Sequence, residues 1–241
     1  MKNNNWKQSK IIGGFKGSFR MNPSYGIGSF LVANLTIKHL WNFIRKDISP
    51  RNVLDVGCGY APHYIFFYPK LSLVNYVGVD WEKSPHYNGS IDYYTNLNEP
   101  MIIDGKFDLI LLMDVIEHLE DVSILLDSLK NNLNADGTMY ITVPFFYWIH
   151  EAPHDYNRYT IYQLKRLLNN SGFSIEDYRI VGGGGTALLD LISKNFLRPL
   201  KLNSMLTRMF LDKFNSLFEL IGLNRNVESY PIEYIIKVRH L

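Results

Sequence analysis

The chain has 241 residues, 46% hydrophobic and 14% aromatic, which is enough apolar material for one sizeable core. Its 25 basic and 23 acidic side chains give a net charge of +2, so no basic field indicates a nucleic-acid partner. The single cysteine, Cys58, excludes an intramolecular disulfide and a cysteine-rich zinc site. The first residues lack a secretory signal, and no apolar run reaches the roughly 20 residues that a membrane helix needs. We therefore expect a cytoplasmic protein without a transmembrane segment, for which peripheral membrane contact stays open.

The N-terminal part, residues 1–50, is expected to hold a polar segment and then a helix over residues 24–45 that Ser24 caps. Residues 51–241 are expected to form the main domain. Five short apolar runs in its first half predict buried parallel strands, at residues 53–56, 76–79, 91–94, 107–112 and 138–143. Helical patterns lie between several of these runs, notably at residues 122–133. This alternation predicts an α/β fold, a Rossmann-like doubly wound sheet whose strand carboxyl ends share one ligand-binding edge.

The second half of the main domain begins with an expected helix over residues 160–171, which Thr160 caps and Gly172 ends in the left-handed conformation. Strands are expected at residues 173–181 and 231–238. Between them, residues 186–224 are expected to form a helical insertion that contains two amphipathic segments.

The second segment of this insertion, residues 205–223, carries a strong apolar face. Its members are Met205, Leu206, Met209, Phe210, Phe214, Leu217, Phe218 and Ile221. We expect this face to pack onto the sheet edge or onto a second copy in a homodimer. The alternative is a lid or surface for a hydrophobic or lipid-linked acceptor, with the glycines at 182–185 as a hinge.

A candidate nucleoside site follows the first strand. Gly57 and Gly59 allow a tight turn with close ligand approach, and Asp80 stands 80 − 57 = 23 positions after Gly57, where a carboxylate can accept both ribose hydroxyls. Pro62 occupies the third-glycine position of a dinucleotide site, which disfavours an NAD-dependent oxidoreductase. A plain strand-terminating turn and a non-enzymatic nucleoside-binding scaffold remain alternatives.

Three motifs in order then resemble class I S-adenosylmethionine-dependent methyltransferases: VLDVGCG at 53–59, Val79-Asp80, and FDLI at 107–110 followed by VIEHL at 115–119. The resemblance covers about residues 50–180. It implies S-adenosyl-L-methionine as cofactor and a sheet of about seven strands whose last strand is reversed.

The resemblance also implies cofactor contacts. Asp55, Gly57 and Gly59 would hold the methionine moiety, and Asp80 the ribose. The remaining expected contacts are Trp81 on the adenine face, Asn96 and Leu97 at the adenine edge, and Asp114 and His118 after the fourth strand. Asn96 departs from the acidic residue common at its position. Packing or helix capping is the alternative role for His118.

The loop over residues 143–160 is dense in aromatic, histidine and charged residues. It resembles the H-E-x-P-x-D-x-x-R-Y-T stretch of a methyltransferase subgroup found among bacterial polysaccharide and small-metabolite enzymes. Methyl transfer requires alignment of a nucleophile and, for oxygen, removal of its proton. We expect methylation of a small-molecule or saccharide-like acceptor at oxygen.

Within this loop His150 is the expected catalytic base, and Asp155 is expected to orient it, bind a sugar hydroxyl or act as base itself. The expected substrate-binding residues are Tyr147, His154, Arg158 and Tyr159. An Asp155–Arg158 ion pair that only fixes the loop is the alternative. A metal site built from His118, His150, His154 and Asp155 has no tight ligand spacing, so none is expected.

Overall fold

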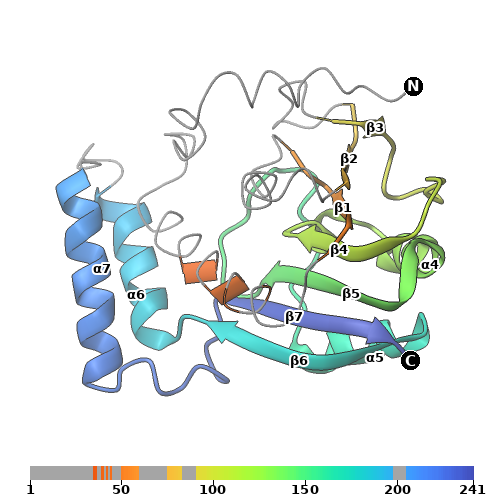
Figure 1. Cartoon of the computed structure of the whole chain (residues 1–241). Coiled ribbons are helices and arrows are strands. Elements are labelled where there is room, and N and C mark those ends of the chain that lie inside the picture. The colour runs from red at the N-terminus through yellow and green to blue at the C-terminus, as the bar shows by residue number, and fades with distance from the viewer. Residues whose placement is uncertain are drawn as a thin grey trace.

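The computed structural model describes residues 35, 36, 39, 40, 42, 44, 50–59, 75–82, 91–197 and 205–241 (Figure 1). Ser24 and Pro62, on which two sequence predictions rest, lie outside these residues. The described positions between 35 and 44 are all helical, and Leu40 and Ile44 are buried. This part of the predicted N-terminal helix is therefore present.

A seven-stranded sheet forms the centre of the molecule, in the order β3-β2-β1-β4-β5-β7-β6 (Figure 1). The strands are β1 (Asn52–Val56), β2 (Asn75–Asp80), β3 (Tyr93–Tyr94), β4 (Phe107–Met113), β5 (Leu133–Pro144), β6 (Phe173–Val181) and β7 (Glu233–His240). β1 to β5 pair in parallel, whereas β7 runs antiparallel to both β5 and β6. The predicted α/β sheet with a reversed last strand is confirmed.

The described helices connect these strands. They are the 3-10 turn η2 (Ile116–His118), α4 (Val122–Asn132), α5 (Ile161–Asn170), α6 (Gly184–Ile192), the π-helical turn η3 (Ser193–Leu197) and α7 (Met205–Leu220). The Thr160 hydroxyl accepts a hydrogen bond from Gln163 N at 3.3 Å, and Gly172 has φ +79°. Both predicted caps of α5 are confirmed, because side-chain capping and left-handed glycine are local properties of sequence.

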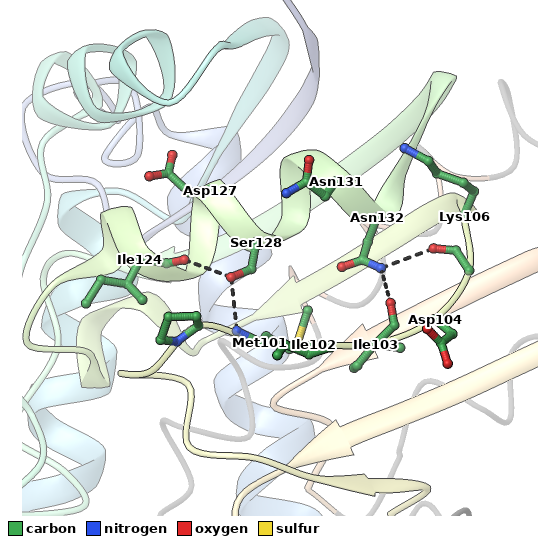
Figure 2. Close-up of a pocket in the computed structure, with 12 residues that line it drawn as sticks. Met101, Ile102, Ile103, Asp104, Lys106, Ile124, Asp127, Ser128, Asn131 and Asn132 are labelled. Carbon is green, nitrogen blue, oxygen red and sulfur yellow. Dashed lines mark hydrogen bonds between the residues drawn. The ribbon is translucent and has the colours of Figure 1, made fainter.

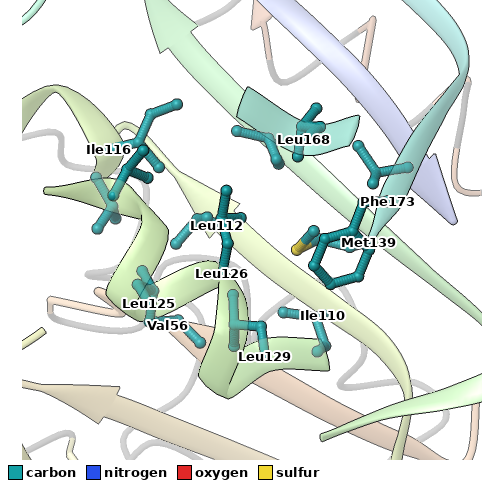
Figure 3. Close-up of a cluster of buried hydrophobic side chains, with 14 of the residues drawn as sticks. Val56, Ile110, Leu112, Ile116, Leu125, Leu126, Leu129, Met139, Leu168 and Phe173 are labelled. Atoms are coloured by element: carbon teal, nitrogen blue, oxygen red, sulfur yellow. The ribbon is translucent and has the colours of Figure 1, made fainter. Parts of the chain in front are cut away.

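The apolar core lies on both faces of the sheet because side chains alternate along each strand. From β4, Ile110 and Leu112 join the cluster that contains Leu125 of α4 and Leu168 of α5 (Figure 3). Leu109 and Leu111 belong to the other cluster, with Leu40 and Ile44. The sheet is therefore covered on both faces, as a doubly wound fold requires.

β3 is shorter than predicted, and β5 is much longer. β3 contains only Tyr93 and Tyr94, because the Asp92 carboxylate accepts a hydrogen bond from Gly78 N at 2.9 Å and replaces part of the strand ladder. β5 begins at Leu133, directly after α4, and is longer than the apolar run at 138–143.

The insertion between β6 and β7 is helical, as predicted, with α6 and α7 side by side beyond one end of the sheet (Figure 1). Its base is closed by a hydrogen bond from Ile232 N to Val181 O at 3.2 Å. None of the described helices combines the length and apolarity that crossing a bilayer requires.

The buried side chains of α7 differ in part from the predicted apolar face. Among the α7 side chains that the structure describes, Leu211 and Asn215 are buried, and α7 packs on α6, where Phe218 of the predicted face also contributes. Phe214 and Leu217, from the predicted face, are 48% and 44% exposed. The Thr186 hydroxyl donates to Asn215 Oδ1 at 2.6 Å, which fixes a contact that hydropathy cannot reveal.

Close packing accounts for at least one of the glycines at 182–185. Gly184 and Gly185 lie inside α6. A Cβ atom on Gly185 would lie 2.7 Å from the Phe218 side chain, so glycine lets α7 approach α6.

An open pocket of about 780 Å³ lies between α4 and the segment at 100–106 (Figure 2). Two polar side chains of α4 bind it to the segment at 100–106. Asn132 Nδ2 donates to Ile103 O at 2.8 Å, and Ser128 Oγ accepts from Met101 N at 3.0 Å. None of the predicted site residues lines this pocket, so it gives no support to a catalytic role.

Candidate active site

The glycine turn after β1 lies against the end of β2, as predicted. Gly57 and Gly59 have φ values of +69° and +51°. The Asp80 carboxylate accepts hydrogen bonds from Gly59 N through Oδ2 and from Trp81 N through Oδ1, each at 2.7 Å. The turn and the acidic residue thus meet at the carboxyl edge of the sheet, where an open α/β sheet binds its ligands.

Asp55 lies within β1 and is buried. Its carboxylate accepts a hydrogen bond from the Tyr76 hydroxyl. Burial, and then the neighbouring Asp55 charge, raise the pKa of Tyr76 well above its usual value. Asp55 therefore has a structural partner on β2 in addition to its predicted cofactor role.

The two residues expected at the adenine edge belong to a local turn. Asn96 is exposed and bonds to Glu99 Oε1 and Asn98 N, whereas Leu97 is buried in the main core. Trp81 contacts His154 edge to face, with ring centroids 5.4 Å apart. The end of β2 therefore touches the loop after β5.

Asp114 directly follows β4 and has φ +53°, a conformation that few non-glycine residues adopt. Its backbone N–H donates to Thr142 O at 3.1 Å, and its Oδ1 accepts from the Thr142 hydroxyl at 2.8 Å. The next residue, Val115, fills the space beside Gly57: a Cβ on this glycine would lie 2.3 Å from Val115 Cγ2. The segment after β4 thus lies directly against the glycine turn.

The loop between β5 and α5, residues 145–160, is held by the Asp155–Arg158 ion pair that the sequence offered as the alternative role of these residues. Arg158 donates to both carboxylate oxygens of Asp155, at 2.5 and 2.8 Å, and to Trp148 O at 3.0 Å. Although burial opposes it, the hydrogen bonds from Arg158 and from His150 N lower the pKa of Asp155 to about 2. Asp155 is therefore ionised across the physiological pH range, and it fixes both ends of this loop.

The β5–α5 loop is also attached to η2. The backbone N–H groups of Tyr156 and Asn157 donate to Glu117 O at 2.9 and 3.1 Å, and Asn157 Nδ2 donates to Leu119 O at 2.9 Å. Tyr159 is buried in the main core, with its hydroxyl 3.5 Å from Ile116 O. These contacts bring two predicted segments, distant in sequence, onto one another.

Their junction is a cluster of Glu117, His118 and His150. Glu117 Oε1 lies 3.7 Å from His118 Nε2 and 3.9 Å from His150 Nε2, and the two imidazole centroids are 4.7 Å apart. On the other side of its ring, His150 Nδ1 lies 3.2 Å from Asp155 Oδ2. The expected pairing of His150 with Asp155 is therefore present.

Glu117 is fully buried, and neither carboxylate oxygen has a hydrogen-bond partner among the described residues. Burial, and then the charge of Asp114, raise the pKa of Glu117 well above its usual value. Burial, and then the neighbouring His118, lower the pKa of His150, so its neutral form is favoured. A neutral imidazole beside a carboxylate can accept a proton from a hydroxyl group.

Sequence reasoning missed two members of this site. Glu117 appears in the sequence only within the VIEHL motif at 115–119. This motif, together with His150 in the β5–α5 loop, is the signal that could have identified Glu117 as a site residue. Lys194, on η3, forms a buried ion pair with Asp190 and lies 3.8 Å from the centroid of the Tyr147 ring. Tyr147 in turn contacts His150 edge to face at 5.2 Å. The insertion therefore reaches the β5–α5 loop.

Comparison with known proteins places this geometry in a family. A family model described as a methyltransferase domain matches residues 33–178. The chain is 27% identical over 195 residues to the ubiquinone biosynthesis O-methyltransferase of Bartonella quintana (strain Toulouse), covering 67% of this chain and 77% of the relative.

Two solved structures share the fold. The O-methyltransferase from a trans-AT PKS multienzyme of Brevibacillus brevis, in complex with S-adenosyl-L-homocysteine, has a TM-score of 0.58 at 14% identity, over 92% of this chain and 82% of that chain. The [4+2]-cyclase SpnF has a TM-score of 0.55 at 13% identity, over 92% and 85%. Because a cyclase has this fold too, the fold alone does not define the reaction.

The family match includes the glycine turn, Asp80, the cluster and the β5–α5 loop, and it favours methyl transfer over a scaffold or an NAD-dependent oxidoreductase. Since the matched region spans well over half of its length, the chain belongs to the methyltransferase-domain family and is a class I S-adenosyl-L-methionine-dependent methyltransferase.

Proposed function

We propose that the protein transfers a methyl group from S-adenosyl-L-methionine to a hydroxyl oxygen of a small-molecule acceptor. The observation that carries this proposal is the His150 imidazole, which lies between Asp155 and Glu117 at the ligand-binding edge of the sheet. The relative from Bartonella quintana, whose name specifies an O-methyltransferase, supports oxygen as the accepting atom.

The residues at the ends of β1 and β2 fit this cofactor. We assign Asp55, Gly57 and Gly59 to the methionine moiety and Asp80 to the ribose. The hydrogen bond from Gly59 N to Asp80 Oδ2 supports this assignment, because it brings the glycine turn and the Asp80 carboxylate close enough for one ligand to contact both. The proposed adenine contacts are Trp81, Asn96 and Leu97, and those near the reacting end are Asp114 and His118.

The acceptor is proposed to lie over the β5–α5 loop. Phe146, Trp148 and Tyr156 are 42%, 43% and 44% exposed there. Their flat rings favour an acceptor with a planar or sugar-like ring. Tyr147 and His154 complete the proposed acceptor surface; Arg158 and Tyr159 support it from beneath, since Arg158 is engaged with Asp155 and Tyr159 is buried.

The cofactor supplies a methyl group that its sulfonium charge has already activated. The protein must align the hydroxyl oxygen with this methyl group and remove the hydroxyl proton. We assign proton removal to His150, with Asp155 as the positioning residue. The Asp155 carboxylate, 3.2 Å from Nδ1 though not in hydrogen-bond geometry, favours a proton on Nδ1 by its charge and leaves the Nε2 lone pair to act.

The test is a methyl-transfer screen with labelled cofactor over phenols, sugar nucleotides and lipid-linked sugars. His150→Ala should lower turnover by at least about a hundredfold, as expected for loss of a general base. S-adenosylhomocysteine affinity, measured by calorimetry, should stay unchanged. His240→Asn is the matched control, because this imidazole lies away from the site, against Leu133 O. Unchanged turnover of His150→Ala with the best acceptor would refute the assignment.

A further inference from the structure

We propose that Glu117, His118 and His150 form a binding site for a divalent transition-metal ion, with Zn²⁺ as the best-fitting ion. The binding claim stands on the geometry alone. Its catalytic consequence rests on the proposed function. The sequence predicts no metal here, because His118, His150, His154 and Asp155 have no tight ligand spacing, and this set does not contain Glu117.

The three side chains present one ligand atom each to a common point. Those atoms, an oxygen of Glu117 and a ring nitrogen of each histidine, all lie within 4.8 Å of one another. Glu117 Oε1 is 3.7 and 3.9 Å from the two Nε2 atoms. Ligands about 2.1 Å from a tetrahedral Zn²⁺ are about 3.4 Å apart, so closure around an ion needs only small side-chain rotations.

Both imidazoles are oriented with Nε2 toward this point. His118 Nδ1 lies 2.5 Å from His154 O, and because a carbonyl only accepts, this nitrogen must carry the proton. His150 Nδ1 lies 3.2 Å from Asp155 Oδ2 without hydrogen-bond geometry, and the negative charge of this carboxylate favours a proton there as well. A metal-binding histidine typically has a carbonyl or carboxylate behind its other nitrogen, and both histidines have one.

The burial of Glu117 supplies an independent argument. Its side chain is 0% exposed, and neither oxygen has a hydrogen-bond partner among the described residues. A buried carboxylate without a partner is costly, and a cation between the three groups would remove this cost. The histidine side chains are 15% and 19% exposed, so an ion can enter from their side.

A further carboxylate lies beside the site, because Asp155 Oδ2 is 3.2 Å from His150 Nδ1, and Arg158 is paired with this carboxylate. Two imidazoles and one carboxylate suit Zn²⁺ and neighbouring first-row ions, whereas Mg²⁺ prefers oxygen ligands.

A bound ion would take over the activation of the acceptor. With His150 Nε2 coordinated, His150 would act as a ligand and no longer as the base. The acceptor hydroxyl would bind the open position of the ion, which would lower its pKa by Lewis acidity, and its proton would pass to solvent water at the partly exposed histidine side of the site. His150→Ala then abolishes methyl transfer whether this residue is a base or a ligand. Direct measurement of metal binding separates the two roles.

The experiment uses the full chain without an affinity tag, stripped with EDTA and dialysed. Calorimetry with ZnCl₂ should show one ion per chain, Co²⁺ should give the visible absorption of a site with nitrogen ligands, and MgCl₂ should bind far more weakly. Glu117→Gln and His118→Ala should each weaken Zn²⁺ binding by at least about tenfold.

His154→Ala is the matched control, because it removes the adjacent imidazole and keeps the carbonyl that orients His118. It should bind Zn²⁺ like the wild type. Circular dichroism checks that each variant folds. If Glu117→Gln does not fold, His118→Ala provides the test, because His118 is partly exposed and its replacement is better tolerated.

Absence of saturable Zn²⁺ binding by the wild type would overturn the inference, as would equal binding by both ligand variants or loss of binding in His154→Ala. If the EDTA-stripped protein binds no added Zn²⁺ but still transfers the methyl group, the inferred metal site is overturned and the proposed function stays intact. One bound Zn²⁺ without transfer to any hydroxyl acceptor would support the site and refute the proposed function.

Discussion

Replacement of Gly57 by alanine tests the contact between the glycine turn and the segment after β4. Two costs add. The φ value of +69° costs a residue with a Cβ atom about 1–2 kcal/mol. The new methyl group would also lie 2.3 Å from Val115 Cγ2, and such overpacking costs about 1–3 kcal/mol. The free energy of unfolding should therefore fall by about 2–5 kcal/mol.

The two costs can be separated by a double-mutant cycle. Val115→Ala removes the methyl groups that the new Cβ would meet but leaves φ at residue 57 unchanged. In this background, Gly57→Ala should cost only the conformational part, about 1–2 kcal/mol. Gly172→Ala is a matched control, because Gly172 has φ +79° and its Cβ would meet only the end of the Lys130 side chain, which can move away.

Urea denaturation of the four proteins in the cycle gives the coupling energy, and calorimetry with S-adenosylhomocysteine reports the effect on the site. Strictly additive costs of Gly57→Ala and Val115→Ala would refute the contact on which this reasoning depends. A cost of Gly172→Ala as large as that of Gly57→Ala would show that conformation, not packing, dominates.

Three further outcomes follow from the structure. Asp80→Ala should weaken S-adenosylhomocysteine binding by about 10- to 100-fold in calorimetry, because it removes a charged hydrogen-bond acceptor; unchanged affinity would contradict the ribose assignment. Lys194→Met should raise KM for the acceptor without changing cofactor affinity, because Lys194 lies over Tyr147; an equal change in both would contradict this. Although partial burial opposes it, hydrogen bonds from the backbone at the start of β1 lower the pKa of Asp108. The wild type should therefore exceed Asp108→Asn in stability above about pH 4 and lose this advantage as the pH falls toward 3, measured by urea denaturation at each pH; a constant difference would contradict it.

The predictions that the structure confirms depend on local sequence. The apolar runs around Leu54 and Ile110 favour strands buried on both faces, and the positive φ at position 57 is a conformation that glycine adopts readily and other residues avoid. Thr160 caps α5 through a bond to a residue three positions away. Each of these signals lies within a few residues of the feature that it predicts.

The features that were not predicted depend on how distant segments meet. Glu117 comes near His150 only because the β5–α5 loop folds back onto η2, and no spacing rule connects the two. Lys194 reaches Tyr147 from an insertion whose placement periodicity does not encode. On α7 the polar Asn215 is buried as well as Leu211, because a Thr186 hydroxyl donates to it, and hydropathy alone does not identify this contact.

The closed base of the insertion has a consequence for how such a protein can change. Ile232 N bonds to Val181 O where the chain leaves β6 and enters β7, so everything between these two residues projects from a fixed point of the sheet. Loop segments anchored in this way can be shortened, lengthened or exchanged with little effect on strand register. A chimera that keeps the sheet and replaces residues 183–231 would retain the glycine turn and acquire a new wall beside Tyr147, so a grafted insertion offers a direct route to altered acceptor choice.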